Sequence, residues 1–373
     1  MITAGIIGAT GYAGVELVRL LASHPDVERL ALSSTSFEGG RIEDVYPNLA
    51  GRVSASLVKP EEVVAASDVV FAALPHGVGE AFAARCMAKG IHFIDLSADF
   101  RFGDDEATFA AWYGKPYAHP ELRAKSVYGL PELNRAATVA LAAKGACIIG
   151  NPGCYPTGAS LGLYPALAKG LLAAGTIIVD AASGVTGAGR NPTQTTHFSD
   201  CSDVLGPYKV GAHRHVPEIA RNLAIMAGKP VPFVFTPHLA PMNRGIISTI
   251  YAPLAVPVAG GSALGGGGVA NPRPPAGEIA ARVAEIQGLY ASFYKDEPFV
   301  RVLGAGSTAT TRNVRGSNYC DISIHLDQAG TTLIVATAID NMVKGAAGQA
   351  IQNMNIALGF RETAGIDAIP AAF

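Results

Sequence analysis

Short apolar runs alternate with amphipathic stretches over the first 100 residues of the chain. Residues 2–7 form an apolar run that ends at a glycine, and residues 12–23 carry apolar side chains at helical spacing. Further apolar runs, with an Ala-rich helical stretch at 79–89 among them, lie at 27–34, 67–77 and 91–100. This alternation predicts a parallel, doubly wound α/β sheet with helices on both of its faces.

The pattern changes after residue 100. Residues 101–135 are aromatic, charged and rich in turns, which predicts loops and short helices beside a site. One more strand is expected at 147–150, and the β-rich runs that follow it predict a second, α+β domain with a mixed or antiparallel sheet. The strands expected in this second domain lie at 175–184, 232–241, 245–256, 299–304, 320–327 and 331–340.

Two late segments have distinct patterns. Residues 259–277 are rich in Gly and Pro, which predicts a flexible surface excursion without a catalytic role, before a helix at about 277–290. Residues 341–358 carry small or apolar residues every three or four positions. This spacing predicts a helix that packs tightly, and we expect it to return to the first domain.

Composition narrows the class of protein. The chain has 373 residues, 49% of them hydrophobic and 16% charged, enough for two or three domains with their own cores. A net charge of -2 offers no basic field for nucleic acid or an anionic membrane, so a small-molecule partner is expected. Five cysteines without a C-x-x-C pair favour reduced thiols, and the absence of a leader or a long apolar run favours a cytoplasmic protein.

Glycines at 8, 11 and 14 follow the first expected strand and open the first expected helix. In that context, bare backbone N–H groups and the helix dipole favour binding of a dinucleotide pyrophosphate, although the glycines alone would also suit a tight turn. The second strand ends in Ser33 and Ser34, with Arg41 shortly after, where an NAD site usually carries an acidic residue. NADP is therefore the expected cofactor, with an ordinary polar loop as the alternative. The expected cofactor contacts in this half of the chain are Gly8, Thr10, Gly11, Tyr12, Gly14, Ser33, Ser34, Arg41 and Pro75.

Cys154 lies in the stretch NPGCYPT, just before Pro156, which suits the first position of a helix. A sulfur beside a helix N-terminus is expected to have a lowered thiol pKa and to act as a nucleophile. For Cys86, Cys147 and Cys320 we expect buried structural roles.

A thiol nucleophile requires a base, and the stretch GAHRHVPEI supplies His213 and His215 ahead of an expected helix start. A histidine there is biased toward the neutral form, so His215 is the first choice, His213 the reserve, and Glu218 a residue that orients or tunes the imidazole. Metal binding by the same residues and a purely structural role remain alternatives. Candidate contacts for an anionic substrate are Arg101, Asn151, Arg190, His238 and Arg244, although Arg101 and the glycine loop at 183–190 would also suit ordinary turns.

Motifs along residues 8–355 together resemble those of the N-acetyl-gamma-glutamyl-phosphate reductases, a family of arginine biosynthesis. In family order they are GATGYAGVEL, LSADFR, YGLPELNR, NPGCYPT, SGVTGAGR, GAHRHVPEI, PHLAPMNRGI, VRGSNYCDI and ATAIDNMVKGAAGQAIQNMN. The related aspartate-semialdehyde dehydrogenases share the fold and the chemistry, but NPGCYPT with HRHVPEI fits the first family better. Thr35 stands where many members carry a basic residue, and the Gly-rich run at 260–268 has no counterpart in the family pattern.

The resemblance implies an NADP-binding Rossmann domain over 1–152, completed by 341–373, and a catalytic and oligomerisation domain over 153–340. It implies NADPH-dependent reduction of an acyl phosphate to a semialdehyde and inorganic phosphate, with Cys154 forming a thioester and the HRH motif moving protons. Ser183, Gly184 and Asn341 match positions near the nicotinamide, and Arg101 matches a role at the substrate phosphate. A homodimer or homotetramer is expected. The alternatives are the same chemistry on aspartyl phosphate or a carrier-bound acyl phosphate, and a non-catalytic NADP sensor.

Overall fold

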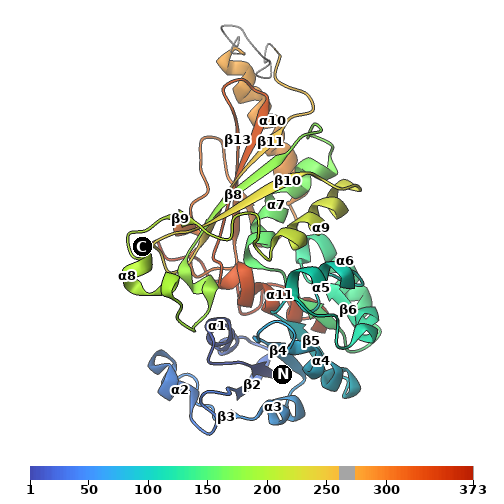
Figure 1. Ribbon diagram of the computed structural model, residues 1–373, viewed down its shortest axis with the longest axis vertical. Helices are drawn as coiled ribbons and strands as arrows, with labels where there is room; N and C mark the ends of the chain where they lie inside the picture. The colour runs from blue at the N-terminus through green and yellow to red at the C-terminus, as the bar shows by residue number, and fades with distance from the viewer. Residues whose placement is uncertain (260–273, 373) are drawn as a thin grey trace.

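The computed structural model describes residues 1–259 and 274–372, so the prediction for the Gly-rich run at 260–268 lies outside the described residues. Its first sheet has seven strands, all parallel to their neighbours, in the order β3-β2-β1-β4-β5-β7-β6 (Figure 1). The parallel sheet predicted from the alternating pattern is confirmed. Its strands are β1 (Ile2–Ile7), β2 (Val27–Ser33), β3 (Leu57–Val58), β4 (Val69–Ala72), β5 (His92–Asp95), β6 (Ser126–Tyr128) and β7 (Ile148–Gly150).

Helices cover both faces of this sheet because successive residues of a buried strand point in opposite directions. On β1, Ile6 packs in the cluster that contains Leu17 of α1 (Tyr12–Leu21), whereas Ile7 packs in the cluster with Val63 of α3 (Pro60–Ala66). The remaining helices of this part are α2 (Ile42–Val45), α4 (Gly79–Ala88), α5 (Glu106–Tyr113) and α6 (Pro131–Ala142). The last of these is longer than the short helices expected there, and it begins with Pro131 and Glu132, both favourable in a first helical turn.

The second sheet also has seven strands, in the order β12-β13-β14-β11-β8-β10-β9. The central strand β11 is antiparallel to both β8 and β14, whereas β8 and β10 run parallel, so the predicted mixed sheet is confirmed. Its strands are β8 (Ile177–Ser183), β9 (Gly206–Pro207), β10 (Phe233–Leu239), β11 (Ile246–Pro253), β12 (Val300–Val302), β13 (Cys320–Leu326) and β14 (Thr332–Ile339).

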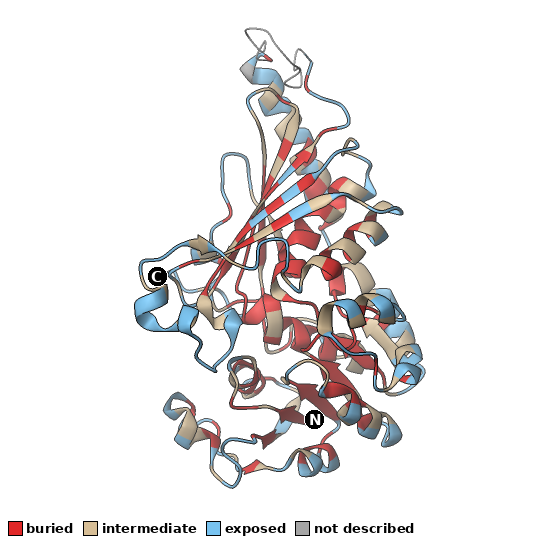
Figure 2. Cartoon of the chain, viewed as in Figure 1, coloured by how far each residue is buried: buried red, intermediate tan, exposed pale blue. Residues whose placement is uncertain are grey.

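One face of the second sheet is covered by α7 (Cys154–Ala168), α9 (Val216–Ala227) and α10 (Ala276–Phe293). The phenol groups of Tyr290 and Tyr294 on α10 donate to backbone carbonyls of α7, at 2.8 and 2.6 Å, and so join the two helices. On the opposite face, Ala309 and Val314 pack against Ala336 and Ala338 of β14, whereas Ile178 of β8 and Val234 of β10 are exposed. Figure 2 shows buried residues alternating with intermediate or exposed ones along β8 and β11, as expected for strands with one covered face.

The chain passes between the two sheets at two places. Three residues separate the end of β7 at Gly150 from Cys154, the first residue of α7. The return path follows β14 through a π-helical turn (Val343–Ala347) into α11 (Gly348–Leu358), which packs in the same cluster as α1. The ends of β7, β8 and β14 therefore meet near the junction of the two sheets.

Candidate active site

A cavity of about 500 Å³ opens at the junction of the two sheets. Cys154 at the start of α7, Ser183 and Gly184 at the end of β8, and the pair His213 and His215 line it. These residues come from three segments far apart in the sequence. The predicted nucleophile and both predicted bases therefore face one enclosed space.

Cys154 is the first residue of α7, two positions earlier than the helix start expected from Pro156. Pro156 is tolerated because the first-turn N–H groups lack helical partners anyway. Among the described residues no side chain caps this helix, so backbone N–H groups face the cavity. Burial nevertheless raises the pKa of the Cys154 thiol to about 11, against the opposing effects of the Tyr155 N–H and of Arg101. The predicted lowering of this pKa is wrong for the resting protein, and the thiol needs a base.

His215 lies directly against the turn that precedes the thiol. A Cβ atom added to Gly153 would stand 2.5 Å from His215 Nε2, so only glycine leaves room for the ring there. His215 Nδ1 is buried and has no hydrogen-bond partner within the described part of the chain. Burial, followed by His213 and Arg101, lowers the pKa of His215 well below its ordinary value. The ring is thus neutral, as predicted, and able to accept a proton.

His213 occupies a different position in the hydrogen-bond network. Its Nδ1 accepts from the backbone N–H of His215 at 3.1 Å, so the proton of the neutral ring resides on Nε2. That Nε2 faces the Tyr208 hydroxyl at 3.5 Å, and Tyr208 donates to Tyr155 at 3.2 Å. Burial, with Lys209 and Arg214, lowers the pKa of His213 to about 4. Both ring nitrogens of His213 are thus engaged, whereas Nδ1 of His215 has no partner among the described residues.

Glu218 does not contact the imidazole that it was predicted to orient. Its carboxylate accepts hydrogen bonds from the Gly153 N–H and the Tyr128 hydroxyl, each at 2.8 Å, and pairs with Arg101 at 3.1 Å. The structure therefore corrects its expected role: Glu218 fixes the turn that carries the nucleophile. The buried Glu218 carboxylate can therefore orient the backbone at Gly153.

Arg101 and Asn151 lie behind the cavity and do not line it. The three guanidinium nitrogens of Arg101 donate to the carbonyl of Asn151 at 2.8 Å, to Glu218, and to the carbonyl of Leu96 at 2.9 Å. The Asn151 side chain donates to the Ala346 carbonyl at 3.1 Å and accepts from Asn353 at 3.1 Å. Both residues thus support the turn before Cys154, and the direct substrate contacts predicted for them stay predictions.

The glycine turn after β1 has the geometry of a pyrophosphate cradle. Gly8 has φ of +87°, and a Cβ atom on Gly14 would stand 2.1 Å from the Gly8 carbonyl oxygen. No side chain within residues 1–259 and 274–372 caps the start of α1, so its N–H groups are free to bind an anion. Beside this turn the buried hydroxyl of Ser33 has no partner among the described residues, while Thr10 and Ser34 bind each other at 2.6 Å. These residues fit a dinucleotide.

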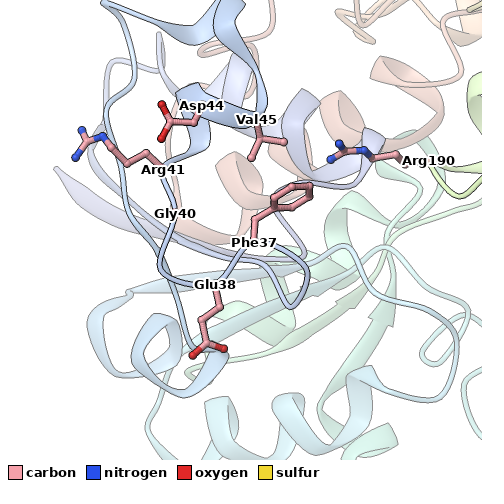
Figure 3. Close-up of a pocket in the computed structure, with 7 residues that line it drawn as sticks. All are labelled: Phe37, Glu38, Gly40, Arg41, Asp44, Val45 and Arg190. Carbon is pink, nitrogen blue, oxygen red and sulfur yellow. The ribbon is translucent and has the colours of Figure 1, made fainter.

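A second cavity, of about 450 Å³, lies beyond the end of β2 (Figure 3). Arg41 lines it, but its guanidinium points away from the other side chains and pairs with Glu43 at 2.8 Å. Arg190 instead points toward Phe37, with its guanidinium carbon 5.1 Å from the ring centroid, and donates to the Thr10 carbonyl at 3.0 Å. Arg190, predicted as a substrate contact, therefore lies at the cavity beyond β2, whereas Arg41, predicted as a cofactor contact, lines the same cavity but is paired with Glu43.

Three residues were predicted to contact the nicotinamide, and all three belong to or support the loop after β8. Ser183 and Gly184 line the cavity with Cys154, and a Cβ atom on Gly184 would stand 2.6 Å from the Asn243 carbonyl oxygen. The amide of Asn341 accepts from the Gly245 N–H at 2.7 Å and donates to Thr186 at 2.9 Å. Asn341 is therefore a buried support of the loop that bears Gly184. Pro75 lies in the exposed loop after β4.

His238 and Arg244 lie away from the cavity. His238 pairs with Asp180, at 3.0 Å between Nδ1 and Oδ1. Arg244 bridges Glu16 of α1, at 2.7 Å, and Asp340 after β14, at 3.1 Å. Arg244 thus joins the two parts of the fold and His238 contacts Asp180, while the substrate contacts predicted for both residues stay predictions.

Several residues that line the Cys154 cavity escaped the sequence analysis. They are His76, Tyr113, Tyr208, Lys209 and Arg214. Lys209 precedes the HRH motif and Arg214 is its central residue, and His76 follows a predicted strand at its carboxyl end, where ligands bind in α/β folds. Those local signals were present in the sequence, whereas their convergence on Cys154 depends on the tertiary fold.

Two further observations describe the site and its surroundings. Among residues 1–259 and 274–372, no group of three or more His, Cys, Asp or Glu residues is arranged to hold a metal ion. No helix in the same ranges is both long and apolar enough to cross a membrane.

Both halves of the chain match known protein families. Residues 3–141 match the family described as semialdehyde dehydrogenase, NAD binding domain. Residues 154–263 and 276–341 match the family described as semialdehyde dehydrogenase, dimerisation domain.

Similar proteins extend over the full length of the chain. It is 48% identical over 373 residues to the N-acetyl-gamma-glutamyl-phosphate reductase of Clostridium beijerinckii, and 46% identical over 375 residues to that of Brachyspira hyodysenteriae, with all of both chains covered in each case. Among solved structures, aspartate semialdehyde dehydrogenase II from Vibrio cholerae in complex with ASA has a TM-score of 0.69 at 16% identity, over 96% of this chain and 98% of that one. Aspartate semialdehyde dehydrogenase from Candida albicans, solved with NADP, has a TM-score of 0.66 at 18% identity, over 96% and 99%.

Proposed function

Because the chain belongs to the N-acetyl-gamma-glutamyl-phosphate reductase family of semialdehyde dehydrogenases, we propose that it reduces N-acetyl-gamma-glutamyl phosphate with NADPH. The products are N-acetylglutamate 5-semialdehyde and inorganic phosphate, in arginine biosynthesis. The observation that carries the proposal is the position of Cys154 at the uncapped start of α7, beside the neutral ring of His215. A thiol and a base so placed suit covalent acyl transfer.

In the first half-reaction, His215 accepts the proton of the Cys154 thiol. The sulfur then attacks the acyl carbon of the substrate, so an S–C bond forms and the bond from carbon to the phosphate oxygen breaks. The protonated imidazole gives its proton to the departing phosphate. Backbone N–H groups at the start of α7 stabilise the negative charge that develops on the acyl oxygen, and a thioester on Cys154 remains.

In the second half-reaction the thioester is reduced by a hydride, which NADPH would supply when bound. The tetrahedral alkoxide left on Cys154 then collapses: the C=O bond of the aldehyde forms, the C–S bond breaks, and the thiolate regains a proton from solvent through His215. Glu218 and Arg101 hold the backbone just before Cys154, at Gly153 and Asn151, so the sulfur keeps one position through both half-reactions. Splitting the reduction in this way replaces one difficult step by two easier ones.

The cofactor in this proposal is NADP(H). Gly8 and Gly14 would receive the pyrophosphate against the start of α1. Arg190 supplies a cation at the cavity beyond β2, and the end of β2 carries Ser33 and Ser34 in place of an acidic residue. A cation and hydroxyl groups favour the 2′-phosphate of NADP over the free hydroxyl of NAD.

The same proposal includes self-association in the cytoplasm. Exposed Val234, Ile178 and Tyr251 lie in register across β10, β8 and β11 on the face of the second sheet opposite α7, α9 and α10. The partner that this face fits is a second copy of this chain, since residues 154–263 and 276–341 match a dimerisation domain. All five cysteines lie in the described ranges and carry free thiols, which supports a reducing compartment.

The deciding experiment measures NADP reduction at 340 nm with inorganic phosphate, using N-acetylglutamate semialdehyde beside aspartate semialdehyde. We expect phosphate-dependent turnover of the acetylated substrate and its loss in Cys154→Ala. Turnover of aspartate semialdehyde alone would keep the chemistry and reject the substrate. Cofactor binding without turnover of either aldehyde, followed by turnover of a carrier-linked aldehyde, would identify a carrier-bound substrate, and inactivity on all three would favour a sensor.

A further inference from the structure

His76 lines the cavity with Cys154, yet the mechanism above assigns it no task. It follows β4 at the carboxyl end of the first sheet, and its half-buried ring packs edge-on against Tyr113 at 5.0 Å between ring centroids. A polar ring at this position faces the space that the reacting group of a substrate would enter.

The hydrogen bonding of His76 determines which nitrogen carries its proton. The backbone N–H of Ala98 donates to Nδ1 at 3.0 Å, so Nδ1 presents a lone pair and the proton of the neutral ring resides on Nε2. Protonation of Nδ1 would place its hydrogen directly against the hydrogen of the Ala98 N–H group. In agreement, burial, with the positive charges of Arg101, Arg214 and Lys115, lowers the pKa of His76 to about 3. His76 is therefore a neutral donor at Nε2 and is unsuited to be the base.

The backbone around His76 is held from two sides. The carboxylate of Asp99 accepts from the N–H groups of Gly77 and Gly79, at 2.5 and 3.1 Å. From the other side, Lys115 Nζ donates to the His76 carbonyl at 3.2 Å. Gly77 has φ of +74°, a conformation that glycine adopts without strain. The ring is thus fixed before any ligand arrives, which is the condition for a specific contact.

We propose that the Nε2–H of His76 binds the phosphoryl group of the acyl phosphate, and inorganic phosphate in the reverse direction. The inference rests on the proposed function and adds a specificity-determining residue to it. Arg214 lines the same cavity and Lys115 lies behind the loop, so the surroundings of His76 favour an anion. His215 retains the proton-transfer task, and His76 distinguishes a phosphorylated carbonyl from an ordinary ester or thioester.

Two substitutions separate the donor from the shape of the ring. His76→Asn keeps an oxygen near the Nδ1 position, able to accept from Ala98, but removes the donor at Nε2. His76→Gln restores an N–H near the Nε2 position. In the reverse reaction, we expect His76→Asn to raise KM for inorganic phosphate roughly 10- to 100-fold, the loss of a hydrogen bond to a charged group, with KM for the aldehyde within about 2-fold of wild type. His76→Gln should recover most of the loss. An unchanged phosphate KM in His76→Asn, or an equal rise of both KM values in both variants, would overturn the inference.

A second measurement separates failure of this inference from failure of the proposed function. In ¹⁵N-labelled wild-type protein, His76 should show a protonated Nε2 and an unprotonated Nδ1, and the Nε2 signal should move when inorganic phosphate is added. If the wild-type protein turns over neither aldehyde, the proposed function fails, and the phosphate titration alone decides the role of His76. A signal that does not move at saturating phosphate rejects that role in either case.

Discussion

Gly345 in the π-helical turn after β14 packs against Cys154 so closely that a Cβ atom on it would stand 2.8 Å from the Cys154 Cβ. The returning chain therefore forms one wall of the pocket around the nucleophile. π-Helical turns occur frequently at functional sites. Here the turn places Gly345, which has no side chain, beside Cys154.

We predict that Gly345→Ala lowers kcat, because the added methyl group must displace Cys154 from its position. A displacement of about 1 Å costs on the order of 100-fold in rate when reacting atoms are held in line. Gly288→Ala, in α10, is the matched control, because a Cβ atom there meets no atom within 4 Å. Steady-state kinetics of both variants, with circular dichroism to verify folding, make the test, and equal kcat values would refute the contact's importance.

Alkylation of Cys154 should be slow at neutral pH and should accelerate as pH rises. Burial raises the pKa of the thiol to about 11, so the reactive thiolate is a small fraction at pH 7 and grows about tenfold per pH unit. Mass spectrometry after timed exposure to iodoacetamide gives the rate at each pH. We expect Cys154 to react before the buried Cys86, Cys147 and Cys320, because only Cys154 among these four lines the cavity. A plateau below pH 9 would show that the thiol ionises more readily than the structure implies.

Arg190 and Arg41 should differ in their effect on cofactor choice. Arg190→Ala removes the cation that faces Phe37, and we expect KM for NADPH to rise roughly 10- to 100-fold, as for loss of a hydrogen bond to a charged group. KM for NADH should change little. Arg41→Ala serves as the control, because that guanidinium already pairs with Glu43. A larger effect of Arg41→Ala would show that the predicted role of Arg41 was the better one.

The buried ion pair between Lys344 and Glu132 should contribute strongly to stability. Both side chains are 0% exposed and their charged atoms lie 2.5 Å apart. Lys344→Met leaves the Glu132 carboxylate buried without its partner, which costs about 3–5 kcal/mol in the free energy of unfolding. The exposed pair of Arg85 with Glu61 is the comparison, and Arg85→Met should cost only about 0–1 kcal/mol. Urea denaturation measures both, and similar losses would contradict the role of burial.

Local patterns were sufficient to predict most strands and to select Cys154 and His215, which the fold brings to one cavity. Cys154 and His215 stand in short motifs whose chemistry depends on near neighbours in the sequence. The burial that raises the pKa of Cys154 comes from segments far along the chain, so the helix-terminus argument alone gave the opposite direction. The position of Arg190 also depends on segments far along the chain. Its loop follows β8, but its guanidinium donates to Thr10, in the turn after β1 of the first sheet.

The junction of the two sheets is also the place about which the sheets could rotate relative to each other. The chain crosses it between Gly150 and Cys154 and returns between β14 and α11, so a rotation of one sheet relative to the other would turn about these two crossings. Cys154 and Gly345 both lie at that pivot. Points near an axis move least, so such a rotation would displace the sulfur less than any residue far from the junction.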